Sequence, residues 1–576
     1  MTSDRNTVNS NDAAERLLSC LNLCHNILRS QEGMTSESAF RELNKLLYVK
    51  YISENELYYS WRYLYEEEYV YRLFEIVKNE FINEQLFDSS DTITSKPKSC
   101  RDVLGTLDYF RFSLANTETG RAYESFVQKV LRNISDEPVI ANVVAEYIVD
   151  FLDIKHYSNV VDPFCGYGGL LSETIAHRQH KPSGETIGYE KDTMLAQTAK
   201  MTLLMGGCRE VRVERKTTDQ YFFDNHFDMV VTCIKHRESI LNDIQKALGL
   251  LKEKGRAALL IADDILQKDQ FEEVRRKLLW QNRIKAIISL PLSAIRLRGR
   301  QTKWSVLFLE GGRTHRMNDE TLIARVENIG VSSVGLPSEK NDFKLIEPVV
   351  SQWLQYGTRQ ACKSVMWVRL SAYEGWNIEA EFLKEENRFE SQYPLFKLGY
   401  LTEMSGDTTE VLDKEEYKLV TVRKNEHDVV LRDIIKTKDI KYPRRQMVVR
   451  SGQMLVSRIN AKDGAIGIVP QELDGAIVSD NFIALSIKSS YIEPYYLLMV
   501  LTSERYKKLL KGISRGVTTL SYIKNVDLLD LEIPVPDKKK QRELIGNLAE
   551  MQQEINSLKN KWKEGVMHFS EELFGL

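Results

Sequence analysis

The sequence predicts a multidomain α/β protein whose central part is a doubly wound, largely parallel sheet. The chain has 576 residues, and because single hydrophobic cores stop growing near ~250–300 residues, we expect two to four domains. Between residues 140 and 312, short apolar segments typical of strands alternate with segments whose apolar residues have helical spacing. Such alternation indicates a parallel sheet with helices on both faces.

The pattern changes on both sides of this sheet. Residues 1–135 predict a helical N-terminal domain and 136–312 the sheet domain, while 313–375 carry little signal and are assigned as an irregular linker. Short β-type segments separated by turn residues predict a mixed α+β domain over 376–535. Residues 536–576 predict a long C-terminal helix. Its apolar residues recur mostly at spacings of three and four, which suits a partner helix, and are Leu544, Ile545, Leu548, Met551, Ile555, Leu558 and Trp562.

Composition excludes several classes of protein. Hydrophobic residues make up 43% and charged residues 28% of the chain, ordinary values for a globular protein. No apolar run approaches the roughly 18 residues that span a bilayer, and the polar N-terminus lacks a signal-peptide pattern, so we expect a cytoplasmic protein with no membrane partner. The seven cysteines form no CxxC pair, which predicts reduced thiols and no bound metal. The net charge of −3, taken alone, does not favour nucleic acid.

A glycine-rich turn follows the predicted strand that ends near Val161. The turn contains Gly166 and Gly168, and Glu190 ends the next predicted strand 22 residues beyond Gly168. Glycines let a ligand approach the backbone closely, and an acidic residue in this position can accept both hydroxyls of a ribose. The pair predicts a nucleoside-type ligand, with a purely structural turn as the alternative.

Three segments in this region resemble a known family. Residues 160–171 (VVDPFCGYGGLL), 188–206 and 227–232 (FDMVVT) are similar to S-adenosylmethionine-dependent adenine-N6 DNA methyltransferases, in particular the modification subunit of type I restriction systems. The likeness extends over about 40–312 and implies the methyltransferase fold and S-adenosylmethionine as cofactor. It places Asp219 near the cofactor's adenine, and the cofactor contacts that it implies are Asp162, Phe164, Gly166, Gly168 and Glu190.

The catalytic motif of that family is degenerate in this chain. In the family, Asn-Pro-Pro followed by Phe or Tyr comes directly after the FDMVVT strand and holds the flipped adenine. Here the positions are Cys233, Ile234, Lys235 and His236, and all thirteen prolines are isolated, so no Pro-Pro pair exists. An aromatic-Thr-Pro element expected further upstream is also missing, because residues 136–141 read DEPVIA.

Three interpretations of Cys233 to His236 stay open. The strand end has become a structural loop and methyl transfer is lost, or Lys235 and His236 now bind phosphate or another ligand, or an unusual methyltransferase uses His236 to hold a base. A lysine also places positive charge beside the sulfonium site, which works against a cationic cofactor. Binding of S-adenosylmethionine is therefore implied by the resemblance and opposed by this residue type.

The C-terminal third resembles the specificity subunit of the same systems. Residues 376–384 (WNIEAEFLK), 451–459 (SGQMLVSRI) and 512–520 (GISRGVTTL) follow the order of its target recognition domain. Within 431–450 there are seven basic and two acidic residues, a local charge of +5. A solvated loop is the alternative, but the resemblance implies DNA contacts. The predicted DNA-binding residues are Lys436, Lys438, Lys441, Arg444, Arg445, Arg458 and Arg515.

The sequence therefore predicts a sequence-specific DNA-binding protein of a restriction-modification-like defence system, related to adenine-N6 methyltransferases but without methyl transfer. Its partners would be double-stranded DNA, a second copy joined through the C-terminal helix, and a nuclease or motor subunit. The alternative is an active S-adenosylmethionine-dependent adenine-N6 DNA methyltransferase with a divergent motif. A third hypothesis, weakened by the basic run, is a protein-interaction scaffold.

Overall fold

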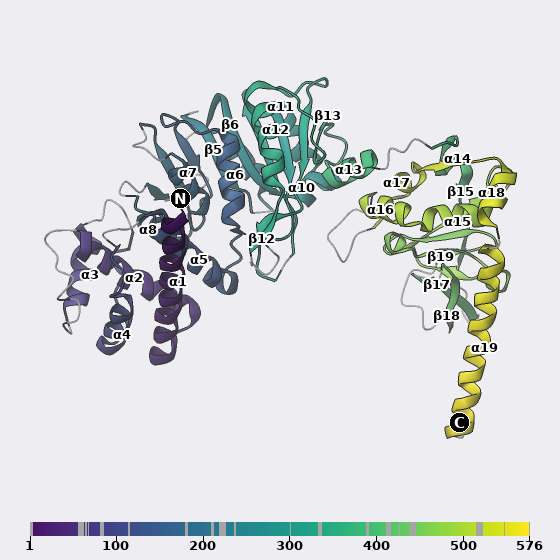
Figure 1. Cartoon of the computed structure of the whole chain (residues 1–576), viewed down its shortest axis with the longest axis horizontal. Coiled ribbons are helices and arrows are strands. Elements are labelled where there is room, and N and C mark those ends of the chain that lie inside the picture. The colour runs from purple at the N-terminus through teal and green to yellow at the C-terminus, as the bar shows by residue number, and fades with distance from the viewer. Residues whose placement is uncertain are drawn as a thin grey trace. The chain divides into compact units, whose positions relative to one another are not determined.

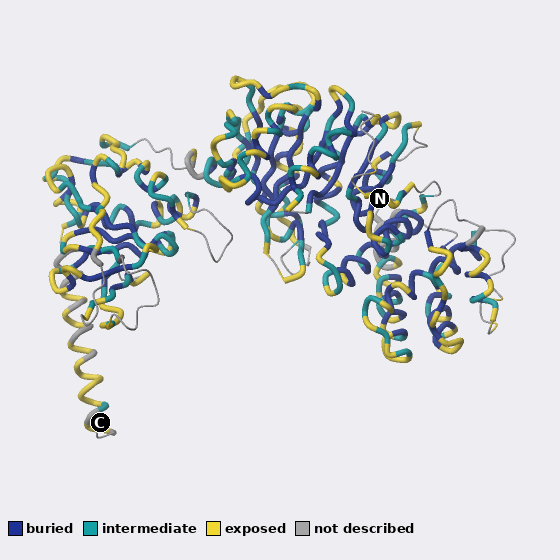
Figure 2. Tube along the Cα trace, turned by 180° about the vertical axis from the view of Figure 1, so that it is seen from behind, coloured by how far each residue is buried: buried dark blue, intermediate teal, exposed yellow. Residues whose placement is uncertain are grey.

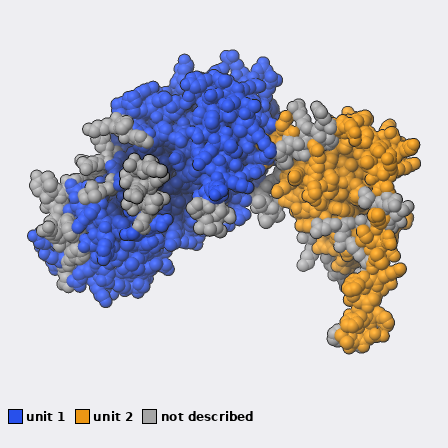
Figure 3. Space-filling model, viewed as in Figure 1, with its two compact units in different colours: residues 1–378 blue, residues 379–576 orange. Residues whose placement is uncertain are grey.

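The computed structural model divides into two compact units, residues 1–378 and 379–576 (Figure 1, Figure 3). It describes residues 4–574 with gaps, and these gaps are 56–62, 64–65, 67, 81–85, 113–115, 179–182, 209–211, 218–219, 221–225, 236–237, 300, 332–336, 387–390, 411–415, 425–426, 437–444, 514–521 and 547. In the part of the chain so described, no helix is both long and apolar enough to cross a membrane.

The first unit begins with five helices: α1 (Asp4–Glu32), α2 (Ser36–Asn55), α3 (Tyr69–Glu80), α4 (Pro97–Leu107) and α5 (Thr117–Ile134). Asn116 caps α5, because its side chain accepts hydrogen bonds from the Glu118 and Thr119 amides. The buried aromatic side chains of this group, such as Phe40 and Phe126, belong to one cluster that also contains Ala199 and Met201 of the sheet region. The helices and the sheet therefore share a continuous hydrophobic core (Figure 2).

A nine-stranded sheet forms the rest of this unit, in the order β13-β10-β7-β9-β6-β5-β2-β3-β4. β2, β3, β4, β5 and β6 are parallel to one another. β9 runs antiparallel between β6 and β7, and β13 is an antiparallel edge strand. The strands are β2 (Val160–Asp162), β3 (Thr186–Glu190), β4 (Val213–Arg215), β5 (Phe227–Cys233), β6 (Leu251–Ala262), β7 (Asn282–Ser289), β9 (Trp304–Gly311), β10 (Thr321–Arg325) and β13 (Val365–Val368).

The connections wind this sheet in two directions from β2 and β5. The chain runs β2-α7-β3-α8-β4 one way and β5-α9-β6 the other, and because such crossovers are right-handed, their helices cover opposite faces. The predicted doubly wound sheet is confirmed (Figure 1). The helices are α6 (Asn142–Leu152), α7 (Gly169–His177), α8 (Thr193–Met205), α9 (Ile240–Leu248), α10 (Asp263–Gln267), α11 (Glu272–Gln281) and α12 (Phe343–Tyr356).

Residues 313–375, assigned from the sequence as an irregular linker, are instead part of the sheet layer. They contain β10, β13 and α12, and β10 pairs in parallel with β7. Phe343 and Trp353 of α12 are buried against this end of the sheet. The assignment was wrong because these short strands lie outside the regular alternation of strand and helix that identified equally short strands such as β2 and β3. Two short pairs complete the unit, β1 (Val139–Ile140) with β8 (Ile295–Arg296), and β11 (Ile329–Val331) with β12 (Pro337–Asn341).

The second unit is mixed α+β, as the sequence predicts. A four-stranded sheet contains β15 (Thr402–Met404), β23 (Phe482–Ile487), β20 (Met454–Ser457) and β21 (Ile466–Ile468). A five-stranded sheet contains β16 (Thr408–Glu410), β19 (Arg445–Val448), β22 (Ile477–Val478), β17 (Glu416–Val422) and β18 (Val429–Lys436). β14 (Leu395–Lys397) pairs with β24 (Glu532–Pro534), and the helices before the C-terminal segment are α13 (Ile378–Glu386), α14 (Leu398–Leu401), α15 (Pro494–Thr502), α16 (Glu504–Ile513) and α17 (Asn525–Leu529).

The C-terminal helix is divided in two, α18 (Lys538–Ile545) and α19 (Leu548–Phe574). Gly546 has a φ of +46° after the last turn of α18, a conformation that glycine adopts readily and that ends the helix. Buried Gln541 fixes α18 through hydrogen bonds to the Tyr491 and Pro536 carbonyls. The described apolar side chains of α19 are exposed, including Leu558 at 58% and Trp562 at 76%. Figure 2 shows most of the described part of this helix as exposed.

Candidate functional site

The glycine-rich turn lies between β2 and α7, as predicted. Gly166 and Gly168 have φ values of +54° and +89°, in the region that favours glycine. Gly168 caps α7 and packs so closely on α8 that a Cβ atom there would lie 3.0 Å from the Ala199 Cα atom. This glycine is therefore required by the packing of α7 on α8, with no ligand needed to explain it.

Asp162 ends β2 and lies buried beneath the turn. Its Oδ1 atom accepts hydrogen bonds from the Thr232 hydroxyl at 2.6 Å and from the Phe164 amide at 3.1 Å. Burial raises the pKa of Asp162 to about 7. Thr232 lies on β5, so this hydrogen bond connects two neighbouring strands at their carboxyl ends, where ligands of such sheets bind.

Glu190 ends β3 and holds the same turn from the other side. Its Oε2 atom accepts from the Gly166 amide at 3.0 Å, and its Oε1 atom accepts from the Asp192 amide at 2.9 Å. Glu190 as a whole residue is 4% exposed, so its carboxylate is buried. The side chain predicted to accept ribose hydroxyls therefore has a hydrogen bond from the protein backbone on each oxygen.

The degenerate motif continues β5 without a break. Cys233 is the last residue of β5 and is buried, and the Ile234 amide donates to the Leu260 carbonyl of β6 at 2.9 Å. Lys235 then turns toward two acidic side chains: its Nζ atom pairs with Glu137 Oε2 and lies 3.7 Å from Glu190 Oε2. The Lys235 side chain is 14% exposed and that of Glu137 is 8% exposed.

The ammonium of Lys235 keeps its charge in this environment. Burial alone would lower its pKa, but the carboxylates of Glu137 and Glu190 outweigh burial and raise the pKa above the usual lysine value. A group of one cation and two carboxylates is thus held at the carboxyl edge of the sheet, and these charges are joined to the Gly166 amide through Glu190.

This arrangement does not fit S-adenosylmethionine. The Glu137 carboxylate lies directly against Gly166, where a ligand would approach the backbone and where a Cβ atom would collide with it. A cationic cofactor bound against this turn would also lie near the Lys235 ammonium, and two positive charges repel each other.

Glu137 and Thr232 were not identified from the sequence as site residues. The altered element at 136–141 was visible, but nothing in it indicates a contact with a residue 98 positions away. The available signal was that two segments of the sequence depart from the family pattern. One of them contains the acidic Glu137 and the other the basic Lys235. Charged partners at such separations become apparent only when the sheet order is known.

Several predicted residues lie outside the part of the chain that is described: His236, Asp219, Lys438, Lys441, Arg444, Arg515 and the side chain of Arg445. Lys436 is exposed at the end of β18 and lies 3.2 Å from Glu416. The Arg458 guanidinium donates to the Asp480 carbonyl at 2.8 Å and to the Ile523 carbonyl at 3.2 Å. This use of Arg458 ties two backbone segments together.

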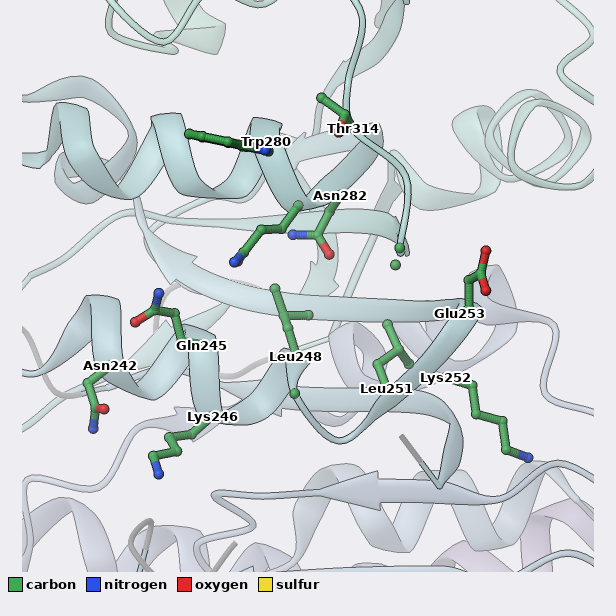
Figure 4. A pocket seen from close by; sticks show the side chains of 14 residues that line it. Asn242, Gln245, Lys246, Leu248, Leu251, Lys252, Glu253, Trp280, Asn282 and Thr314 are labelled. Atoms are coloured by element: carbon green, nitrogen blue, oxygen red, sulfur yellow. The ribbon is translucent and has the colours of Figure 1, made fainter. Parts of the chain in front are cut away.

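A separate cavity of about 740 Å³ opens at the opposite end of the strands from the glycine-rich turn (Figure 4). It is lined by Leu251 and Asn282, the first residues of β6 and β7, and by Lys246 and Trp280. Trp280 as a whole residue is 69% exposed. Parallel strands begin at this edge, whereas Asp162 and Glu190 end strands at the opposite one. The cavity is therefore distinct from the place where the cofactor was predicted.

The strand order, the inserted antiparallel strand β9, the glycine turn and the acidic end of β3 define an S-adenosylmethionine-methyltransferase-like fold. The N-6 DNA methylase family matches this region over residues 116–239 and 219–366. The match begins at Asn116, the N-cap of α5, and runs past β10 into the edge strand β13, so it includes most of the segment that was assigned as a linker.

Known proteins with similarity to this chain include both a specificity subunit and a modification subunit. The MjaX specificity subunit of a type I restriction enzyme from Methanocaldococcus jannaschii is 29% identical over 124 residues, covering 20% of this chain and 29% of that protein. Among solved structures, the type IIG restriction endonuclease BpuSI shares the fold with a TM-score of 0.52 and 11% identity, covering 90% of this chain and 73% of that one. A type I modification subunit from Vibrio vulnificus gives 15% identity and a TM-score of 0.48, covering 62% and 92%.

The chain is therefore similar to the N-6 DNA methylase family over residues 116–366 and, over 124 residues, to a specificity subunit of a type I restriction enzyme. The chain spans less than a third of the specificity subunit it matches.

Proposed function

We propose that this protein binds DNA at specific sequences for a restriction-modification-like system and does not transfer methyl groups. The observation that supports this most is the state of the segment that follows β5. Ile234 is hydrogen-bonded into the sheet and Lys235 is ion-paired with Glu137, so the segment acts as part of the scaffold.

Methyl transfer to adenine needs a hydrogen-bond acceptor for the amino group of the flipped base. The side chains of Cys233 and Ile234 supply no amide or carboxylate acceptor, and the Lys235 ammonium carries three donors and no acceptor. The site therefore presents the wrong hydrogen-bonding group at this position, in addition to lacking the Pro-Pro pair.

DNA recognition is proposed for the second unit. It is supported by the basic run over 431–450, where the side chains of Arg432, Lys436 and Arg450 are exposed. Two of these groups have exposed acidic neighbours. Lys436 lies 3.2 Å from Glu416, and Arg450 lies 3.7 Å from Asp407. Such surface pairs are weak and can exchange for DNA phosphates.

A DNA site made of two separated halves would need two copies of this chain, because each chain provides one recognition unit. We propose that α19 joins them. Its exposed apolar residues form a stripe at spacings of three and four, the pattern of a helix that packs on another helix. The stripe consists of Met551, Ile555, Leu558, Trp562, Val566, Phe569 and Leu573.

A methylation assay tests the enzymatic part. The full chain would be incubated with S-adenosylmethionine labelled on the methyl group and with DNA of mixed sequence, next to an active adenine methyltransferase. We expect no label in the DNA. Sequence-specific labelling of adenine would establish the alternative function, an active methyltransferase with a divergent motif, in which His236 would be the first residue to replace.

A gel-shift titration at several salt concentrations tests DNA binding. Arg444→Glu/Arg445→Glu should weaken binding and reduce the slope of log K against log salt by about 2, since each lost phosphate contact removes about 0.9. Lys397→Glu/Lys488→Glu changes the net charge equally outside the basic run, at one exposed and one partly exposed position. Equal effects of the two variants would contradict the proposed contact surface.

A further inference from the structure

We propose that the cofactor pocket of this protein is closed from inside, with the Lys235 ammonium serving as a built-in cation that Glu137 and Glu190 hold in place of S-adenosylmethionine. The inference deepens the proposed function and rests on it, because it gives the loss of methyl transfer a structural cause. It concerns binding of the cofactor, which is a separate property from transfer.

The two places where the sequence departs from the methyltransferase family meet in space. Glu137 lies in the segment between α5 and β1, where the aromatic-Thr-Pro element would be, and Lys235 occupies the third position of the catalytic motif. They are 98 residues apart in sequence and form an ion pair with both side chains largely buried. Burying a charge is costly, and the opposite charges of Glu137 and Lys235 compensate each other.

The position of Glu137 is fixed by the elements around it. Its own amide donates to the Ser135 hydroxyl at 3.1 Å, and two residues later the chain enters β1, where Val139 pairs with Arg296 of β8. The carboxylate is thereby held against Gly166. The face of the glycine turn that a cofactor would use is covered by a side chain whose backbone is anchored at both ends.

Glu190 completes the closure. Its two oxygens accept from the Gly166 and Asp192 amides, and the Lys235 ammonium lies 3.7 Å from Oε2. A ribose would have to compete with this ammonium for the carboxylate. If Lys235 and Glu137 were both replaced, the Glu190 carboxylate would face the pocket without a cation and would attract the positive charges of S-adenosylmethionine.

Calorimetry and equilibrium dialysis test the closure on the full chain with S-adenosylmethionine. We expect no saturable binding to the wild-type protein. The variant Lys235→Ala/Glu137→Ala removes both sides of the ion pair and leaves Glu190. We expect it to bind S-adenosylmethionine with a dissociation constant at least tenfold below the highest concentration at which wild type shows no binding. Arg276→Ala/Glu273→Ala, an exposed pair on α11, is the matched control and should behave as wild type.

Three results would overturn the inference: binding of S-adenosylmethionine to the wild-type chain, failure of a folded Lys235→Ala/Glu137→Ala variant to bind, or equal gain in the control. Circular dichroism establishes whether the variant is folded. If it is not, acetylation of lysines in the native wild-type chain decides. Lys235 should then resist acetylation at least tenfold more than Lys397, which is exposed, and reaction at equal rates would overturn the closure.

The two proposals fail in different ways. A wild-type chain that binds S-adenosylmethionine but transfers no methyl group would overturn the closed pocket and leave the proposed function standing. Methyl transfer to DNA would overturn both. Loss of DNA binding would affect only the proposed function, because Glu137 and Lys235 belong to the first unit.

Discussion

Lys235 and Glu137 form a buried ion pair at the carboxyl edge of the nine-stranded sheet. Each residue lies in a segment where the sequence departs from the methyltransferase resemblance. The ion pair therefore joins these two segments, and its energetics can be measured.

Lys235→Met should destabilise the first unit by roughly 3–5 kcal/mol, because it removes the cation that pairs with the largely buried Glu137 carboxylate. Glu137→Gln should cost less, because the Lys235 ammonium still lies 3.7 Å from the Glu190 carboxylate. The double variant should lose much less than the sum of the two, and a double-mutant cycle in urea, followed by circular dichroism, gives the coupling free energy. Additive effects would show that the two charges do not interact in solution.

Glu124 on α5 predicts a pH dependence of stability. Burial, together with the nearby Glu173 carboxylate, raises its pKa to about 8, whereas in the unfolded chain it is about 4.3. Folding therefore binds a proton, and this contribution to stability is present below about pH 4 and is lost as the pH rises through about 8. Glu124→Gln should remove this dependence, which corresponds to roughly 2–4 kcal/mol between pH 5 and 8.

Melting temperatures of wild type and Glu124→Gln across this pH range provide the measurement. The wild-type chain should lose more stability than the variant as the pH rises. Glu118→Gln, in the first turn of the same helix, serves as the control and should follow wild type. Parallel pH profiles for Glu124→Gln and wild type would show that the Glu124 carboxyl titrates alike in the folded and unfolded chains.

Arg458 should behave as a structural residue, although the sequence resemblance suggested a DNA contact. Its guanidinium donates to the exposed Asp480 carbonyl and to the partly buried Ile523 carbonyl, so Arg458→Ala should cost about 1 kcal/mol through the loss of these two hydrogen bonds. The salt dependence of DNA binding should remain that of wild type. A reduced salt slope with unchanged thermal stability would instead favour the DNA contact.

The stripe on α19 predicts a concentration-dependent dimer. Leu558→Glu/Trp562→Glu places two charges in the apolar stripe, and size-exclusion chromatography with light scattering should then give the mass of one chain, where wild type gives two. Glu564→Lys, on the opposite side of the helix, should not change the mass. A monomeric wild-type protein at all concentrations would exclude this role of α19.

The sheet region could be predicted because its strands alternate regularly with helices along the sequence, even where a strand is as short as β2. The same reasoning fails at Thr321–Arg325 and Val365–Val368, where this alternation stops and the strands are defined by their neighbours in the sheet. The turn with Gly166 and Gly168 was identified because glycine leaves a local signal. The break at Gly546 also has a local signal, but a single glycine in a long apolar pattern does not by itself predict the end of a helix.

The candidate site was only partly predictable for a related reason. Asp162 and Glu190 lie at strand ends, so their proximity follows from the parallel sheet. The contacts of Glu137 and Thr232 depend on which strands are neighbours and on how the segment before β1 is anchored. Such contacts are tertiary, and no spacing within one segment of the sequence encodes them.

The common core of the N-terminal helices and the sheet limits how this protein can be divided. Phe126 of α5 and Met201 of α8 belong to one buried cluster, so a fragment that begins at residue 136 would expose apolar surface that the intact chain covers. Residues 1–135 therefore cannot be exchanged between related proteins as an independent cassette. Recombination that preserves folding is expected to carry the helices and the sheet together, whereas the second unit, with its own cores, could be exchanged alone.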